Sequence, residues 1–171
     1  YGRTYGEHRE FLEFSLDQHK ELKLFCENNK IEYSTSVWDL SSANEIVSLN
    51  PNFIKVPSAC NNNFKMLEVL RDSYKGQVQL SIGMTTKNEI EKIVNFFENK
   101  NQSKDRLLIY SCTSGYPVPP IDVCLLEIKL LFEKYGNRIN KIGFSGHHNG
   151  IAIDIAAYSI GATWIERHFT K

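Results

Sequence analysis

His147 and His168, two histidines near the ends of strand-like segments, are the residues best suited to metal chemistry in this sequence. Ser145 lies two positions before His147, and Glu166 lies two positions before His168. Because side chains two apart on a strand share a face, each segment is predicted to present both polar groups to one side. Two neutral imidazoles on neighbouring strands would bind a divalent cation and leave positions for water or substrate oxygens.

The alternative is that each histidine is a hydrogen-bonded structural residue, as single strand-end histidines more often are. A second histidine, His148, directly follows His147. Alternation along a strand lets only one of these two side chains face inward, and parity with Ser145 favours His147. The spacing therefore predicts His147 and His168 as the metal ligands.

A lysine inside the apolar segment "FIKVPSA" suggests an anion site. Burying the Lys55 ammonium is unfavourable unless it meets an anion, although a lysine can also extend its head group to the rim. Hydroxyl-bearing residues follow most of the strand-like segments. They would cap helix N-termini, and the same termini bind phosphate. Ser58, Ser81, Ser114 and Ser145 fit either role, while Thr35 ends the first strand-like segment and Tyr116-Pro117 also fits a rigid turn.

Strands alternate with helices along the chain, which predicts βαβ units and a parallel sheet. The polar residues at the carboxyl ends of these strands would lie along one rim of the sheet, where ligands bind. An open doubly wound sheet and a (β/α)₈ barrel both fit, but no glycine-rich nucleotide-binding motif follows a strand. The strands are predicted at 31–36, 52–59, 77–84, 106–114, 140–148 and 163–169, and the helices at 15–28, 41–50, 62–76, 86–100, 119–136 and 149–162; 96–104 contains a predicted solvated loop.

The composition excludes several kinds of protein. The 171 residues carry 20 basic and 20 acidic side chains, so nucleic acid is not an expected partner. No apolar run is long enough to span a bilayer and no signal peptide opens the sequence, so no membrane association is expected. The irregular spacing of four cysteines argues against structural zinc or a disulfide framework, and predicts free, mostly buried thiols in the cytoplasm.

Six motifs in order resemble the sialic acid synthase family. They are "YGRTYGEHREFLEFS" (1–15), "KVPSACNNNF" (55–64), "LSIGM" (80–84), "CTSGYP" (112–117), "GFSGHHNGIAI" (143–153) and "GATWIERHFT" (161–170). The family includes synthases of N-acetylneuraminate, N-acylneuraminate 9-phosphate, legionaminic acid and pseudaminic acid. The resemblance implies a (β/α)₈ barrel that condenses phosphoenolpyruvate with an N-acetylmannosamine-type sugar. Such a transferase forms a nine-carbon 2-keto acid, releases phosphate and uses Mn²⁺ or Mg²⁺.

The resemblance also assigns roles to residues of this sequence. It implies that His147 and His168 bind the metal, and that Glu166 and Tyr116 lie near the sugar and metal. It places Glu166, Lys55 and Tyr116 in the catalytic machinery. The substrate-binding residues that it implies are Thr35, Lys55, Ser58, Ser81, Ser114, Tyr116 and Ser145, with phosphoenolpyruvate held by all of these except Tyr116. Many bacterial members have Asn in place of Ser114 and Asp in place of Gly146, so the sequence is more similar to the animal 9-phosphate synthases. Whether the acceptor sugar is phosphorylated stays open.

The resemblance further implies that residues 1–171 are part of a barrel, matching about the third to the eighth strand. The first two strands and a C-terminal antifreeze-like domain are expected outside this segment, and the full-length protein is expected to be a homodimer. Two alternatives stay open: a synthase of another nonulosonic acid on the same barrel, and a non-catalytic barrel fragment. Intact Lys55, His147, Glu166 and His168 argue against the second, because a scaffold has no need of buried charge.

Overall fold

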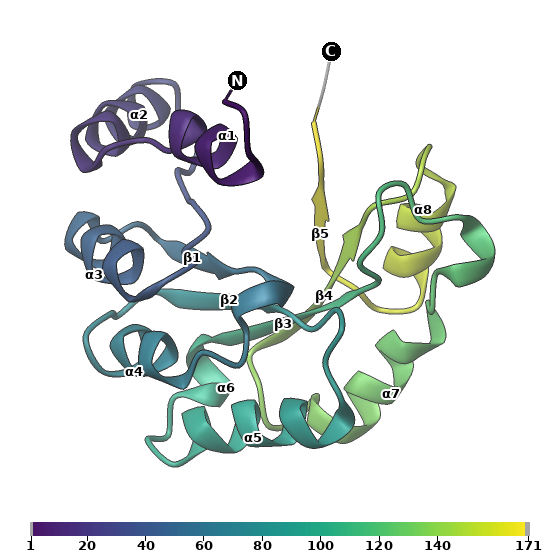
Figure 1. The fold of residues 1–171 in the computed structure, drawn as a ribbon. Helices are drawn as coiled ribbons and strands as arrows, with labels where there is room; N and C mark the ends of the chain where they lie inside the picture. Colours follow the sequence, from purple (N-terminus) through teal and green to yellow (C-terminus); the bar gives the residue numbers. More distant parts are fainter. Residues whose placement is uncertain (1, 170–171) are drawn as a thin grey trace. The chain divides into compact units, whose positions relative to one another are not determined.

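The computed structural model describes residues 2–169, which divide into two compact units, one ending at Ser34 and the other beginning at Thr35 (Figure 1). Among the described residues, no helix combines the length and the apolar character needed to cross a membrane.

Two helices form the first unit, α1 (Tyr5–Leu12) and α2 (Leu16–Asn28). The Thr4 side chain accepts a hydrogen bond from the first turn of α1, and Ser15 opens α2 with a capping box. The helix predicted at 15–28 is thus confirmed, whereas α1 was not predicted. Neither helix contains a buried residue.

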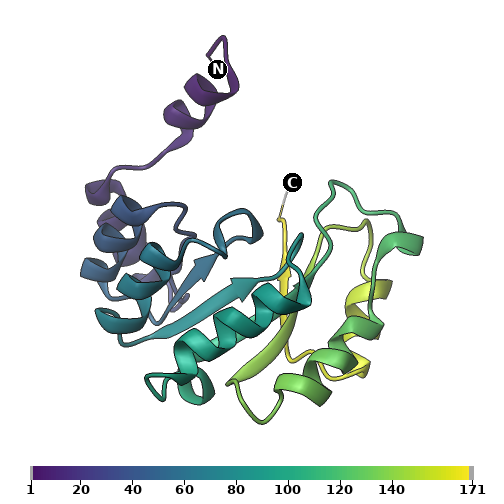
Figure 2. The same cartoon turned by 60° about the horizontal axis from the view of Figure 1, so that its bottom comes forward.

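A parallel sheet of five strands lies in the second unit, and the strands pair in chain order. One or more helical segments connect each strand to the next, as a parallel ladder requires. The sheet is lined on one side by these helices (Figure 2). The strands are β1 (Phe53–Val56), β2 (Gln77–Ser81), β3 (Leu107–Cys112), β4 (Lys141–Gly146) and β5 (Trp164–Arg167).

The strand predicted at 31–36 is wrong. Only Ser36 forms a bridge to the sheet, opposite Lys55. Two backbone hydrogen bonds hold this bridge: Lys55 N–H donates to the Thr35 carbonyl at 3.1 Å, and Val37 N–H donates to the Lys55 carbonyl at 2.9 Å. The pairing therefore covers too few residues to form a strand, although it extends the edge of β1.

The described part of the second unit contains six α-helices and two short 3₁₀-helices. Thr86 and Glu89 form a capping box at the start of α5, which lies within the helix predicted at 86–100. The helices are α3 (Leu40–Leu49), η1 (Ser58–Cys60), α4 (Phe64–Asp72), α5 (Lys87–Glu98), α6 (Ser103–Arg106), η2 (Pro120–Asp122), α7 (Leu126–Tyr135) and α8 (Ala152–Ser159).

Two predictions about helices need correction. The single helix expected at 119–136 is divided into η2 and α7, because consecutive prolines restrict its start and Val123 adopts an extended conformation. The loop expected at 96–104 contains the end of α5 and the start of α6. Arg106, the last residue of α6, donates hydrogen bonds to the carbonyls of Leu70 and Gly76, each at 2.9 Å, which holds this short helix against the fold.

Alternation along the strands separates an apolar face from a polar one. Ile54, Leu80 and Ile109 belong to the hydrophobic core shared with the helices. On the other face of the same strands lie Lys55 and Tyr110, whose ring centroid is 5.2 Å from the lysine Nζ. The polar face thus lies opposite the face that packs into the hydrophobic core.

The sheet is strongly curved, as contacts between side chains of its two opposite edge strands show. Flat strands would separate β1 from β5 by about 19 Å, four intervals of about 4.8 Å. Yet Lys55 Nζ lies 2.9 Å from Glu166 Oε2, and the rings of Phe53 and Trp164 have centroids 5.9 Å apart. The second unit is therefore part of an incomplete (β/α)₈-type barrel, with its polar face inside the curve.

Candidate active site

An ion pair between Lys55 and Glu166 lies at the centre of the polar face. The Lys55 residue is 8% exposed, and its ammonium donates to Glu166 Oε2 at 2.9 Å. The same carboxylate oxygen accepts the Ser145 hydroxyl at 2.6 Å. An ammonium group has three protons, so Lys55 can bond Glu166 and still donate to an incoming anion. This geometry is compatible with the anion interpretation of Lys55.

Hydroxyl groups surround the glycine that follows β2. The Gly83 N–H donates to Ser58 Oγ at 3.0 Å. A Cβ at Gly83 would lie 2.4 Å from Ser114 Oγ and 2.8 Å from Ser58 Oγ, so only glycine lets both hydroxyls come this close. Ser81 is 2% exposed, and its Oγ has no hydrogen-bond partner within residues 2–169. A buried hydroxyl without a partner is a group that a ligand oxygen could satisfy.

The other predicted hydroxyl residue, Thr35, joins the site through its backbone. Its carbonyl accepts from the Lys55 N–H at 3.1 Å and so helps to hold the strand that carries the lysine.

The imidazoles of His147 and His168 lie on the same side of the sheet, as parity predicts. Their ring centroids are 5.3 Å apart. The Tyr116 ring packs edge-on against both, with centroids 4.5 Å from His147 and 5.6 Å from His168. Tyr116 itself is 72% exposed, so this aromatic side chain forms a wall at the rim.

Local contacts prepare His147 for ligation through one nitrogen. Its Nδ1 lies 3.2 Å from the Thr113 carbonyl, which can only accept, so Nδ1 carries the proton and Nε2 keeps its lone pair. Burial lowers the pKa of His147, which favours the neutral imidazole that metals require. Two facing imidazoles fit a divalent cation that takes its other ligands from water or substrate. Within residues 2–169 there is no group of three or more metal-binding side chains.

Three site residues were missed by the reading of the sequence: Gln79, Tyr110 and Cys112. The Tyr110 hydroxyl donates to Gln79 Oε1 at 2.7 Å, and burial raises its pKa, which keeps the phenol neutral. Cys112 Sγ lies 3.7 Å from Ser58 Oγ and 4.0 Å from His147 Nδ1. All three share the inward parity of their strands, but parity alone does not distinguish a site residue from a structural one.

The cysteines depart in part from expectation. All four are free thiols, but only Cys112 is buried, and Cys124 is exposed.

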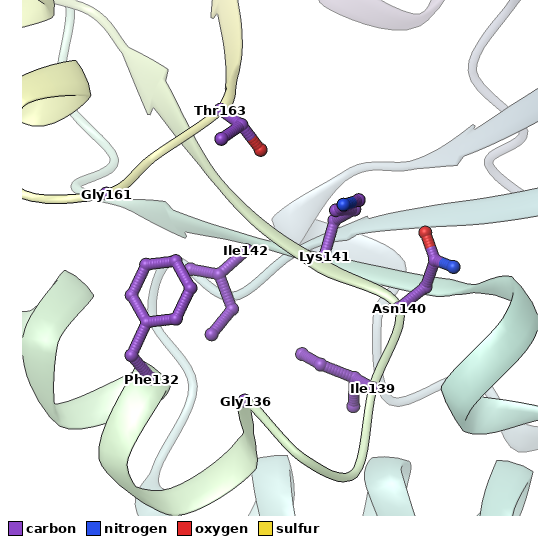
Figure 3. Close-up of a pocket in the computed structure, with 8 residues that line it drawn as sticks. All are labelled: Phe132, Gly136, Ile139, Asn140, Lys141, Ile142, Gly161 and Thr163. Atoms are coloured by element: carbon purple, nitrogen blue, oxygen red, sulfur yellow. The ribbon is translucent and has the colours of Figure 1, made fainter.

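A cavity of about 240 Å³ lies at the opposite ends of the strands (Figure 3). It opens where β4 and β5 begin, and no predicted site residue lines it. Phe132 and Ile142 supply apolar walls, and Lys141 is its one ionisable side chain. The remaining lining residues are Gly136, Ile139, Asn140, Gly161 and Thr163.

A curved parallel sheet with ionisable groups gathered at its carboxyl ends defines a protein of the (β/α)-barrel class with a polar site at that rim. Comparison with known proteins then narrows the class. The sequence profile of the NeuB family matches residues 1–171, and the chain belongs to this family.

Two relatives are N-acetylneuraminate-9-phosphate synthases. The protein from Drosophila melanogaster is 37% identical over 170 residues, which are 99% of this chain and 44% of the relative. The protein from Homo sapiens is 37% identical over 171 residues, which are 99% of this chain and 46% of the relative. The chain therefore spans about half the length of these relatives.

A solved structure resembles the fold closely. The N-acetylneuraminic acid (sialic acid) synthetase from Leptospira borgpetersenii, crystallised with citrate, aligns with a TM-score of 0.84 and 32% identity. The alignment covers 92% of this chain and 53% of that protein.

Proposed function

We propose that the protein containing this chain condenses phosphoenolpyruvate with an N-acetylmannosamine-type sugar, or its 6-phosphate, and releases phosphate. Family membership supports the reaction class, since the relatives are named as synthases of this kind. The structural observation that carries the proposal is the buried Lys55 ammonium at the centre of the polar face, close to a pair of imidazoles.

In this proposal the anionic substrate binds between Lys55 and the hydroxyl groups near Gly83. Lys55 offers a charge-assisted donor, and the Ser58, Ser81 and Ser114 hydroxyls supply further hydrogen bonds to phosphate or carboxylate oxygens. Fixing both anionic groups orients the enol carbon toward the sugar, which lowers the entropic barrier to carbon–carbon bond formation. The fixed donors also stabilise charge that develops during the reaction.

His147 and His168 are the side chains that would hold the divalent metal, Mn²⁺ or Mg²⁺. When bound there, the cation would act as a Lewis acid on the aldehyde oxygen of the open-chain sugar. Tyr116 packs against both rings and would limit their movement.

C3 of phosphoenolpyruvate attacks the aldehyde carbon, the aldehyde oxygen takes up a proton to become a hydroxyl, and C2 is left as an oxocarbenium. Water adds to C2 and loses one proton. The resulting hydroxyl loses its own proton as the C2–O bond to phosphate breaks, which leaves the 2-keto group and inorganic phosphate. Glu166 is a candidate acceptor for the water proton, and its bonds to Lys55 and Ser145 support an equal role in orienting the site.

The proposal includes further features of the whole protein. We place it in the cytoplasm as a homodimer. It takes small-molecule substrates, and no nucleic acid or membrane surface is required.

An acceptor panel tests the reaction. The full protein is mixed with phosphoenolpyruvate, Mn²⁺ and each sugar in turn, and released phosphate is measured. Release with N-acetylmannosamine or its 6-phosphate supports the proposal, and the faster acceptor decides the phosphorylation state. Release only with precursors of legionaminic or pseudaminic acid would assign another nonulosonic acid. No release with any acceptor would contradict an enzymatic role.

Lys55→Ala tests the anion site. We expect the KM for phosphoenolpyruvate to rise at least about tenfold, because a charge-assisted bond contributes roughly 1.5–3 kcal/mol, while the KM for the sugar changes little. Lys141→Ala is the matched control, since Lys141 begins β4 at the other end of the sheet. A larger effect on the sugar KM would move Lys55 to the other substrate.

A further inference from the structure

The residues adjacent to the two imidazoles form a second cluster. His148 follows His147, Arg167 precedes His168, and alternation places them on the opposite face of the sheet. His148 is 3% exposed and stacks on Phe144, with ring centroids 5.9 Å apart. A Cβ at Gly146 would lie 2.9 Å from His148 Cε1, so glycine makes room for this ring.

Arg167 joins the ends of β4 and β5. The ladder between these strands stops at the pair Gly146–Arg167, and the loop after β4 needs other hydrogen-bond partners. The Arg167 guanidinium supplies two of them, because Nη2 donates to the His148 carbonyl at 2.6 Å and Nη1 to the Gly150 carbonyl at 3.0 Å. Both bonds hold the loop that carries His147.

The same guanidinium fixes two side chains. Its Nη1 bonds Asp154 Oδ2 and lies 2.8 Å from His148 Nε2. Nη1 has two protons for three polar atoms within reach, because the Gly150 carbonyl competes with these two, and His148 Nε2 also lies 3.4 Å from Asp154 Oδ2. His148 Nδ1, Asp154 Oδ1 and Arg167 Nε are buried without a partner within the described part of the chain.

Stability alone is a poor explanation for this cluster. A partly buried ion pair with unsatisfied atoms contributes little, and apolar residues often replace such pairs without loss. The cluster instead constrains geometry. It connects His148, the residue after one imidazole, to Arg167, the residue before the other.

We propose that Arg167 is a positioning residue that sets the separation of the His147 and His168 imidazoles by clamping the loop after β4. This inference rests on the proposed metal pair. Replacing a residue that holds a metal ligand in place commonly weakens metal affinity by about 10- to 100-fold.

The direction in which Arg167→Met changes the cation affinity distinguishes an effect of charge from an effect of geometry. Arg167→Met removes a positive charge near the cation and leaves the Asp154 carboxylate without its guanidinium. Both changes would tighten cation binding if charge were the only effect. Weaker binding in this variant therefore reports lost geometry.

Calorimetric titration of the full protein with Mn²⁺ tests the clamp. We expect Arg167→Met to raise the Mn²⁺ Kd at least about tenfold. Arg167→Lys should also weaken binding, because one ammonium cannot reproduce the planar fork of donors. It provides a second variant if the first does not fold. Arg138→Met is the matched control, since the Arg138 side chain has the same 29% exposed fraction and bonds the α5 carboxylates instead. Its Mn²⁺ Kd should be unchanged.

The outcomes distinguish a failure of the Arg167 clamp, meaning its hold on the loop after β4, from a failure of the His147–His168 metal pair. If His168→Ala abolishes Mn²⁺ binding while both Arg167 variants bind within twofold of wild type, the clamp is overturned and the metal pair stands. If the wild-type protein itself takes up no Mn²⁺, the metal pair fails and the clamp fails with it. Equal weakening by Arg138→Met would show general destabilisation and would also overturn the clamp.

Discussion

At the residue scale, the tightest constraint in the site is the absence of a side chain at Gly83. The Ser58 hydroxyl, from η1, and the Ser114 hydroxyl, from the loop after β3, both occupy the space that a Cβ at Gly83 would need. A serine hydroxyl can rotate away from a methyl group at small energetic cost, so crowding here would change the donor geometry more than the fold.

Gly83→Ala is therefore expected to impair substrate binding selectively. We predict that the KM for phosphoenolpyruvate rises roughly tenfold, as loss of about one good hydrogen bond implies, with a small change in thermal midpoint. Steady-state kinetics and a thermal unfolding curve of the same preparation measure both.

Gly6→Ala in α1 is the control for Gly83→Ala, because its nearest neighbour would be Thr4 Oγ1 at 3.8 Å. An unchanged KM in Gly83→Ala would mean that these hydroxyls do not contact the substrate.

His168→Ala tests the metal pair at the same scale. We predict loss of both Mn²⁺ binding and phosphate release, because a single imidazole leaves too few protein ligands for a divalent cation. Calorimetry and the phosphate assay measure the two effects. Near wild-type turnover with an unchanged metal requirement would refute the assignment of His147 and His168.

Much of the site was predictable from residue parity. Lys55, Ser145 and Glu166 converge on one face because their strands alternate, and the imidazoles follow by the same rule. Gln79 and Tyr110 obey the rule too, but glutamine and tyrosine also occur on structural sheets, so parity alone did not mark them.

At the element scale, an ion network joins α5 to α7 and to the turn that follows α7. The Arg138 guanidinium binds Glu98 through two bonds of 2.7 and 2.8 Å, and it lies 2.9 Å from Glu91. Lys134 also contacts Glu91 at 2.9 Å. These two cations, chiefly Arg138, lower the pKa of Glu91 from 4.5 to about 2.

Arg138→Met should destabilise the chain by about 1 kcal/mol, a value kept small because these side chains are about a third exposed and solvent screens them. The pH dependence follows from the lowered pKa of Glu91. The stabilisation is fully present above pH 4.5 and is lost as the pH falls toward about 2. Urea unfolding at several pH values measures the difference between variant and wild type.

That difference should shrink as the solution is acidified. A difference that stays constant between pH 7 and pH 3 would show that Arg138 acts through packing and not through charge.

Helix existence was easier to predict than helix extent. Capping boxes at Ser15 and Thr86 are local signals, and both helices begin where these residues predict. The break between η2 and α7 depends on how a proline-containing segment packs, and the missing strand at 31–36 depends on pairing with β1. Neither feature is encoded within a short window.

At the scale of the whole second unit, curvature brings the residues of the candidate site together. No single segment of sequence specifies it. The family resemblance implied a barrel, whereas alternation alone also fitted an open doubly wound sheet. The structure decides between them, since Lys55 and Phe53 on β1 reach Glu166 and Trp164 on β5.

A double-mutant cycle on Phe53 and Trp164 tests this curvature in solution. Edge-to-face aromatic pairs contribute about 0.5–1.5 kcal/mol beyond their buried area, so Phe53→Ala and Trp164→Ala should be coupled by that amount in urea unfolding. On a flat sheet the two sites would be about 19 Å apart and their effects would add. Phe64 packs against Phe96 instead, so Phe64→Ala combined with Trp164→Ala is the additive control. Additivity in both cycles would mean that the strands do not curve enough to bring Lys55 to Glu166, and the anion site would then lose its central ion pair.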